Sequence, residues 1–466
     1  MNRGSLREHF PSILVAALSS AFGVALLQVT GNLAIAIAAD EVAGQASTLG
    51  LFLGIVAIVF IVIATYVGAI VTSNTFAIIV AGRTRRIALM RLLGSTARSQ
   101  RSAVATEGLV VGIIGSLAGL VLGTAVSFGL ISVAVATKFV EPLAFQYLEP
   151  VILIPIAGVV LTTWLASWVG SRRVLSVSPV QATGAAQEAR AEEAAGHRGR
   201  NVAAIVLFAF GTLLLAGGVL VGLISPAGVL IGVVGGILSF TGLVLGSQLI
   251  MPPALRLVGR MLGSSPASRL AAENAVRYPE RSARTTIGLV IGVTLVTMFA
   301  VAVASFQRII EEARAIEPEM YYGIDEILLV TVVIFSVLIG FSALIAAVGM
   351  VNTLSLSVLQ RTRELGLLRA LGFTSGQLRS MIRAESAQLT VTAILVGLVL
   401  GIGYGWAGAQ SFLGAVNGSP GIIAPVVPLW LLAVVAVAAA VLTLVASVTP
   451  ARRATRIAPV VALAVD

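Results

Sequence analysis

Two charged stretches of this sequence carry the same residue types at the same spacing. Each matched pair lies 278 positions apart, as Arg83 and Arg361 do. The further pairs are Arg91 and Arg369, Gly94 and Gly372, Thr96 and Thr374, and Glu107 and Glu385. Arginine forms charge-assisted hydrogen bonds with carboxylates and phosphates, which suits recognition rather than covalent catalysis. The pattern predicts a docking element that occurs twice.

The second stretch predicts a helix, a tight turn and another helix. Leucines recur on one face of the first helix at i, i+3 and i+6 spacing, namely Leu365, Leu368 and Leu371. Gly372 suits the residue just after a helix end. Thr374 and Gln377 have the spacing of a capping box for a helix over Ser375–Glu385. Lipid anchoring would explain the arginines, but not the matched glycine, threonine and glutamate.

These elements belong to an integral membrane protein. Hydrophobic residues make up 58% of the chain, charged residues 11%, and the mean hydropathy is +1.03. A soluble domain has roughly 45–50% apolar and 25% charged residues. Ten apolar spans are predicted: Ile13–Ile37, Leu51–Val80, Val104–Val133, Val151–Val169, Val202–Leu223, Gly228–Ile250, Thr286–Ser305, Ile327–Val358, Leu389–Phe412 and Pro428–Val448. The second and eighth spans are unusually long, which predicts tilted or protruding helices.

The charges predict the topology. With the loops placed alternately on the two sides, every arginine except Arg308 and Arg314 falls on one side, which the positive-inside rule assigns to the cytoplasm. Both termini are then cytoplasmic. The net charge of +10 reflects this topology and contact with anionic lipid, not nucleic acid.

Metal and disulfide chemistry find little support in the sequence. Cysteine is absent, which excludes disulfides and thiolate metal sites. His9 and His197 lie in polar flanks with no carboxylate or histidine at ligand spacing, so we expect both to be exposed and ordinary.

The chain divides into five predicted segments: a four-span repeat over 1–182, a cytoplasmic linker over 183–200, two further spans over 201–251, a cytoplasmic amphipathic segment over 252–284, and a second four-span repeat over 285–466. Because both copies start on the same side, the duplication is parallel rather than inverted.

The run Met350–Gln360 followed by Arg361–Gly372 resembles the signature of FtsX-like (MacB-like) ABC transporter permeases. The resemblance is strong in the last repeat, fair in the first and absent from the two middle spans. It implies an all-α fold whose four-helix unit carries a coupling helix that docks on a separate ATP-binding subunit. The implied coupling residues are Arg361, Glu364, Leu365, Gly366, Arg369 and Gly372 in the second copy, and Arg83, Arg86, Ile87, Ala88, Arg91 and Gly94 in the first.

The chain departs from the family pattern in two ways. Arg86 and Ala88 stand where the second copy has Glu364 and Gly366, so the two docking sites are expected to differ. Many members also carry a large extracytoplasmic domain between the first two spans of a unit. Here the loops 38–50 and 307–326 are too short for an independent domain.

The resemblance implies the permease subunit of a bacterial plasma-membrane ABC transporter that exports or extracts an amphipathic or hydrophobic substrate. Two ATP-binding subunits would hold ATP and Mg²⁺, and this chain would bind no cofactor and be no enzyme. Its only lysine, Lys138, lies in Thr-Lys-Phe, so it has no P-loop.

Three alternatives stay open. One is mechanical signalling to an extracytoplasmic partner, such as a cell-wall hydrolase or a sensor kinase, for which the acidic segment 311–322 is a candidate contact. The second is an ion-driven carrier, although the centres of the spans hold no acidic residue. The third is a membrane-embedded enzyme, for which no converging acid–base pair is visible.

Overall fold

The computed structural model of this chain describes residues 3–39, 47–82, 84–137, 142, 145–147, 149–172, 198–261, 272–273, 279–319, 336, 340, 344, 372–416, 418–419, 421–437 and 441. Within this part of the chain the regular structure is helical, and no strand occurs. The described part of the fold is therefore all-α, as the family resemblance implies. Of the eighth predicted span the structure describes only residues 336, 340 and 344, and of the tenth it describes residues 428–437 and 441.

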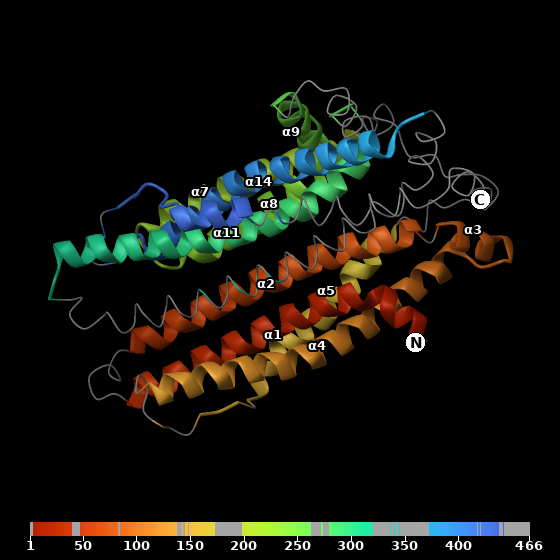
Figure 1. The fold of residues 1–466 in the computed structure, drawn as a ribbon. Coiled ribbons are helices and arrows are strands. Elements are labelled where there is room, and N and C mark those ends of the chain that lie inside the picture. Colours follow the sequence, from red (N-terminus) through yellow and green to blue (C-terminus); the bar gives the residue numbers. More distant parts are fainter. Residues whose placement is uncertain are drawn as a thin grey trace. The chain divides into compact units, whose positions relative to one another are not determined.

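The chain forms two compact units, which we describe separately (Figure 1). The first unit contains α1 (Arg3–Ala39), α2 (Ser47–Gly82), α3 (Thr84–Leu92), α4 (Ala97–Ala136), the short 3₁₀ helix η2 (Pro150–Ile152) and α5 (Leu153–Gly170). The second contains α7 (Arg198–Gly222), α8 (Gly228–Leu245), α9 (Ser247–Met261), α11 (Pro279–Ile316) and α14 (Ser375–Leu413).

The repeat is visible in the helices as well as in the residues. The helix α4 begins at Ala97 and α14 at Ser375, again 278 positions later. Each is preceded by an extended threonine whose side chain accepts a hydrogen bond from the third residue of the helix: Thr96 from the N–H of Ser99, and Thr374 from that of Gln377. In both units this helix packs along the first helix, α4 along α1 and α14 along α11.

Glycines set the close approach of these helix pairs. A Cβ on Gly119 of α4 would lie 2.5 Å from the carbonyl oxygen of Ala17 on α1. A Cβ on the matched Gly397 of α14 would lie 2.7 Å from the Cβ of Val293 on α11. Small residues that let helix backbones approach closely are typical of helix pairs in membranes, where van der Waals packing replaces the hydrophobic effect.

Seven helical segments within the described ranges are long and apolar enough to cross a membrane, and they coincide with seven of the ten predicted spans. The helix lengths correct the prediction that the second span is unusually long. The 36-residue α2 is not exceptional, because α1, α4, α11 and α14 contain 37, 40, 38 and 39 residues. The predicted separate helix over Ser375–Glu385 is likewise the first part of α14, because nothing after the Thr374 cap interrupts the helix.

The two middle spans attach to the second repeat. The helices α7 and α8 pack closely, since a Cβ on Gly211 would lie 2.2 Å from the backbone nitrogen of Ser239. This hairpin also packs on α14, where the Ser239 and Tyr404 hydroxyls are 2.9 Å apart. Gly222, at the end of α7, lies against the backbone of Ser411.

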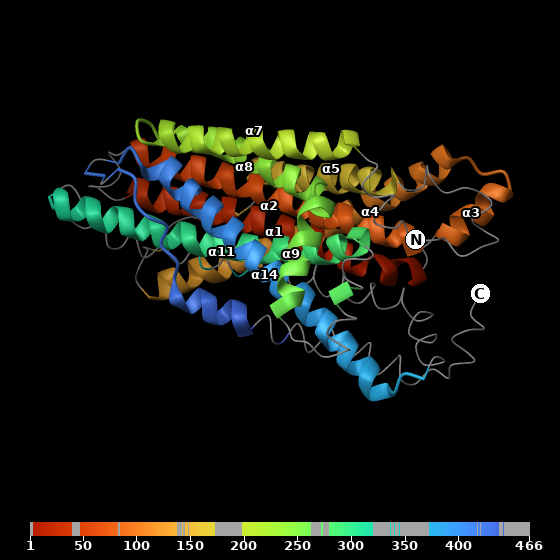
Figure 2. The ribbon, with the colours of Figure 1, turned by 90° about the horizontal axis from the view of Figure 1, so that it is seen from above.

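Residues 252–261 of the predicted amphipathic segment lie in α9, which begins earlier than expected and runs across the long helices of its unit (Figure 2), whereas residues 279–284 of that segment already belong to α11. Leu255 and Val258 are buried against the unit, while Leu257 and Met261 are exposed. The Gln388 side chain on α14 donates a hydrogen bond to the Leu255 carbonyl at 2.8 Å. The helix is thus amphipathic, with one face fixed to α11 and α14.

The loops at the far ends of α4 and α14 are held differently in the two units. In the first unit, α1 side chains hold the loop: Gln28 donates to the carbonyl of Tyr147, and Asn32 to that of Gln146. In the second, Gln410 of α14 donates to the carbonyl of Gly421. The repeats therefore share their helix pairs but not the contacts of these loops.

Replacement of Gly119 by alanine is expected to lower the melting temperature of the purified protein. The added methyl group would overlap α1 backbone atoms, and overpacking of this kind costs typically about 1–3 kcal/mol. Gly129→Ala on the same helix is the matched control, because no atom lies within 4 Å of its Cβ position. Thermal unfolding in detergent should show a lower transition for the first variant only, and equal transitions would contradict the close packing.

Candidate coupling site

The first copy of the predicted docking element forms α3 and a tight turn into α4. Gly94 adopts a φ of +96°, a left-handed conformation that favours glycine. The N–H of Gly94 donates to the carbonyl of Arg91 at 3.1 Å, and that of Ser95 donates to the carbonyl of Met90 at 3.0 Å. These two bonds define a Schellman motif, which ends the helix at a fixed point.

One face of α3 is anchored in the protein. Ile87 and Ala88 are buried in an apolar cluster with Phe76 and Val80 of α2 and with Val104 and Val111 of α4. This cluster packs α3 against the two long helices that flank it in sequence.

The other face of α3 is apolar and uncovered within its unit. The exposed fractions of Leu89, Met90, Leu92 and Leu93 are 47%, 39%, 57% and 82%. Contiguous exposed apolar residues next to arginines are typical of sites that contact another protein or the membrane. Arg91 is half-buried between the two faces, and Arg98 on the first turn of α4 is exposed. This apolar face was not predicted from the sequence, although Leu93 and Leu371, which also lie 278 positions apart, were a signal for it.

The other predicted coupling residues lie partly on α3 and partly outside the described residues. Arg86 lies on α3. Arg83, Arg361, Glu364, Leu365, Gly366 and Arg369 lie outside the described residues. In the second copy the structure describes the turn: Gly372 has a φ of +97°, and the predicted capping box of Thr374 and Gln377 is present. Their side chains and backbone exchange two hydrogen bonds, of 3.0 and 3.2 Å.

A buried histidine lies beside the anchored face of α3. His9 of α1 is fully buried, and its Nε2 lies 3.1 Å from Oε2 of Glu107 on α4. Its ring stacks on Phe76 at 5.6 Å between centroids. The expectation that His9 is exposed is therefore wrong, because the carboxylate neighbour comes from a helix distant in sequence. His197 lies outside the described residues.

Arg101, six residues before Glu107 on α4, contacts α5. Its guanidinium carbon lies 3.7 Å from the centre of the Trp168 ring, and its Nη2 donates to the Trp168 carbonyl at 3.1 Å. This cation–π contact joins the first turns of α4 to the end of α5. Among the described residues, no group of three or more His, Asp or Glu side chains could hold a metal ion.

A comparison with known protein families shows the family of this chain. The sequence profile described as FtsX-like permease C-terminal matches residues 58–179 and 336–459, together more than half of the chain. The chain belongs to the FtsX-like permease family. The two matches start 278 positions apart and end 280 apart, so they coincide with the internal repeat of this FtsX-like permease.

Individual relatives match over shorter stretches. The uncharacterized ABC transporter permease YknZ of Bacillus subtilis is 37% identical over 105 residues, which cover 22% of this chain and 25% of YknZ. The macrolide export ATP-binding/permease protein MacB of Rhodopirellula baltica is 29% identical over 166 residues, 34% of this chain and 23% of MacB. These matches thus cover about a quarter of each relative's length. The family and the long apolar helices make the chain a multi-pass membrane protein.

The left-handed conformation of Gly372 can be tested by substitution. Gly372→Ala is expected to lower stability by about 1–2 kcal/mol, the usual cost of a left-handed conformation for a residue with a Cβ. Gly376→Ala is the matched control, because Gly376 is exposed and lies in the regular first turn of α14. Chemical unfolding in detergent should separate the two variants. Equal stabilities would contradict the turn.

Proposed function

We propose that this FtsX-like permease is the transmembrane subunit of an ABC transporter and that separate subunits bind and hydrolyse ATP. The single observation that carries the proposal is the two-faced structure of α3. One face is exposed and apolar and is available for a partner, while the other is packed between α2 and α4. Such a helix can receive a displacement from a bound subunit and pass it to the membrane helices.

The long helices support this transmission. At about 1.5 Å per residue, the 36-residue α2 is roughly 54 Å long, which exceeds a hydrocarbon core of about 30 Å. A displacement at the α3 end can therefore reach the opposite end of the same helix. Because the docking element occurs twice in the sequence, we infer that one chain binds two ATP-binding subunits, with Arg361, Glu364 and Arg369 contributing in the second copy.

The proposal includes the orientation of the chain in the membrane and the lipid contacts of α9. The arginine distribution favours α3 and both termini on the cytoplasmic side of a bacterial plasma membrane. On that side α9 would lie along the membrane, with its exposed residues Arg256, Leu257, Arg260 and Met261 contacting anionic lipids. We propose export or extraction of a hydrophobic or amphipathic substrate, which the name of the MacB relative supports.

The exposed face of α3 can be tested by co-purification with the candidate ATP-binding subunit. Leu93→Glu is expected to weaken the complex about tenfold or more, because burial of a leucine contributes about 1.5–3 kcal/mol and a factor of ten corresponds to about 1.4 kcal/mol. Glu364→Arg and Arg369→Glu should weaken binding or uncouple ATP hydrolysis at the second docking element.

Ile224→Glu is the matched control for this experiment. Ile224 is 85% exposed and lies in the turn between α7 and α8, away from both docking elements in the sequence. If Leu93→Glu and Ile224→Glu bind the ATP-binding subunit equally well, α3 is not the docking site.

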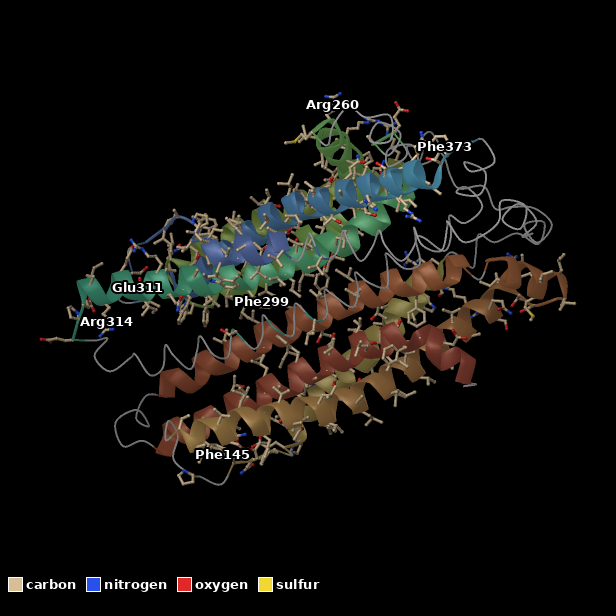
Figure 3. All side chains as sticks on the ribbon, viewed as in Figure 1. Phe145, Arg260, Phe299, Glu311, Arg314 and Phe373 are labelled. Atoms are coloured by element: carbon tan, nitrogen blue, oxygen red, sulfur yellow. The ribbon has the colours of Figure 1, made fainter. Side chains whose placement is uncertain are left out.

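Mechanical signalling is a second candidate function, favoured by the end of α11 (Figure 3). Glu311 and Arg314 are exposed there, and Arg308 pairs with Glu312. Beyond the helix, Glu317 and Glu319 are exposed as well. A photo-crosslinking residue at Glu317 should capture an extracytoplasmic protein if the complex signals. Adducts with lipid alone would argue against this function.

A further inference from the structure

The contact between His9 and Glu107 joins a third helix to the coupling site. The chain connects α3 directly to α2 and, through the turn, to α4, whereas α1 joins α2 only at the opposite end of the unit (Figure 1). Near α3, the helix α1 can therefore follow a displacement only through non-covalent contacts. Two of these contacts belong to His9: Glu107 on α4, and Phe76 on α2.

Packing alone does not require a histidine at this position. The matched residue of the second repeat, 278 positions later, is Ile287, which is 4% exposed on α11. An isoleucine thus serves where α11 packs along α14. Burial of a polar ring costs free energy unless a partner compensates for it. In the first repeat the Glu107 carboxylate lies 3.1 Å from Nε2 as a polar neighbour, and neither ring nitrogen of His9 forms a hydrogen bond of regular geometry within the described structure.

The contact between His9 and Glu107 also lies next to the buried cluster that holds α3. Phe76, which stacks on His9, belongs to the same buried cluster as Ile87 and Ala88 of α3. Glu107 lies one helical turn after Val104, another member of that cluster. Ile13, one turn after His9, packs against the cluster as well. His9 thus adds a polar contact with Glu107 to the apolar packing of this cluster.

We propose that His9 is a positioning residue that makes α1 move together with α3 when the ATP-binding subunit changes state. This inference rests on the proposed function. Ile287 cannot form a polar contact of this kind with Glu385. The two repeats would therefore differ in coupling: the first helix of the first repeat is tied to its coupling helix by a polar contact, and that of the second repeat is held by apolar packing at the matched position.

The experiment compares His9→Ile with His9→Gln in the complex of the full chain and its ATP-binding subunit. His9→Ile installs the residue of the second repeat, which preserves burial and removes the polar contact. His9→Gln keeps an N–H donor for Glu107. Three quantities are measured for each variant: co-purification of the subunit, permease-stimulated ATP hydrolysis, and a distance between α1 and α4.

The distance comes from paired spin labels at Phe10→Cys and Ser102→Cys, both exposed and near the α3 end. The absence of native cysteine makes this labelling specific. With ATP analogue bound, His9→Ile is expected to broaden the distance distribution and to lower stimulated hydrolysis on the order of fivefold or more, within the usual range of coupling between sites. Binding should be unchanged, and His9→Gln should restore both quantities toward wild type.

Ile287→Val, at the matched position of the second repeat, is the control and should leave hydrolysis unchanged. If His9→Ile binds the subunit and matches wild type in hydrolysis and in distance distribution, the inference is overturned while the proposed function stands. The same holds if His9→Gln is as defective as His9→Ile, because the polar contact is then not the cause. Failure of the wild-type chain to bind the subunit instead overturns the proposed function, and the inference with it.

Discussion

Close approach of helix backbones at glycine is the constraint on which the rest of this structure depends. Where Gly119 and Gly123 of α4 face α1, and Gly397 and Gly401 of α14 face α11, a single added methyl group would overlap the neighbouring helix. Between apolar helices in lipid, such contact replaces the hydrophobic effect as the source of association. These rigid pairs hold α4 and α14 in place, and with them the turns that precede each helix.

The two repeats share this framework and differ in what is attached to it. In the second repeat α9 is bonded to α14 through Gln388, and the α7–α8 hairpin covers α14 near Tyr404. In the first repeat the corresponding support near the coupling turn comes from His9 and from the contact of Arg101 with Trp168. The two copies of the repeat have therefore kept their helix pairing, while the contacts around it differ.

The sequence predicted those features of the fold that depend on local residue patterns. Apolar length located seven spans that the structure describes, and the glycine and threonine spacing predicted the turn at Gly372 and the capping box at Thr374. The profile match bears out the repeat and the family. The sequence did not predict contacts between helices distant in the chain. His9 and Glu107 are 98 positions apart, so no local spacing reveals that one is the partner of the other.

The attachment of α7 and α8 to α14 has a consequence for biosynthesis. The hairpin is complete at Leu245, and α14 begins at Ser375, 130 residues later. At a synthesis rate of about 5–20 residues per second, the hairpin waits roughly 6–26 s for its partner. During that interval Gly222 and Ser239 lack their partners Ser411 and Tyr404 on α14. The α7–α8 surface on which α14 packs is thus synthesised before α14 itself.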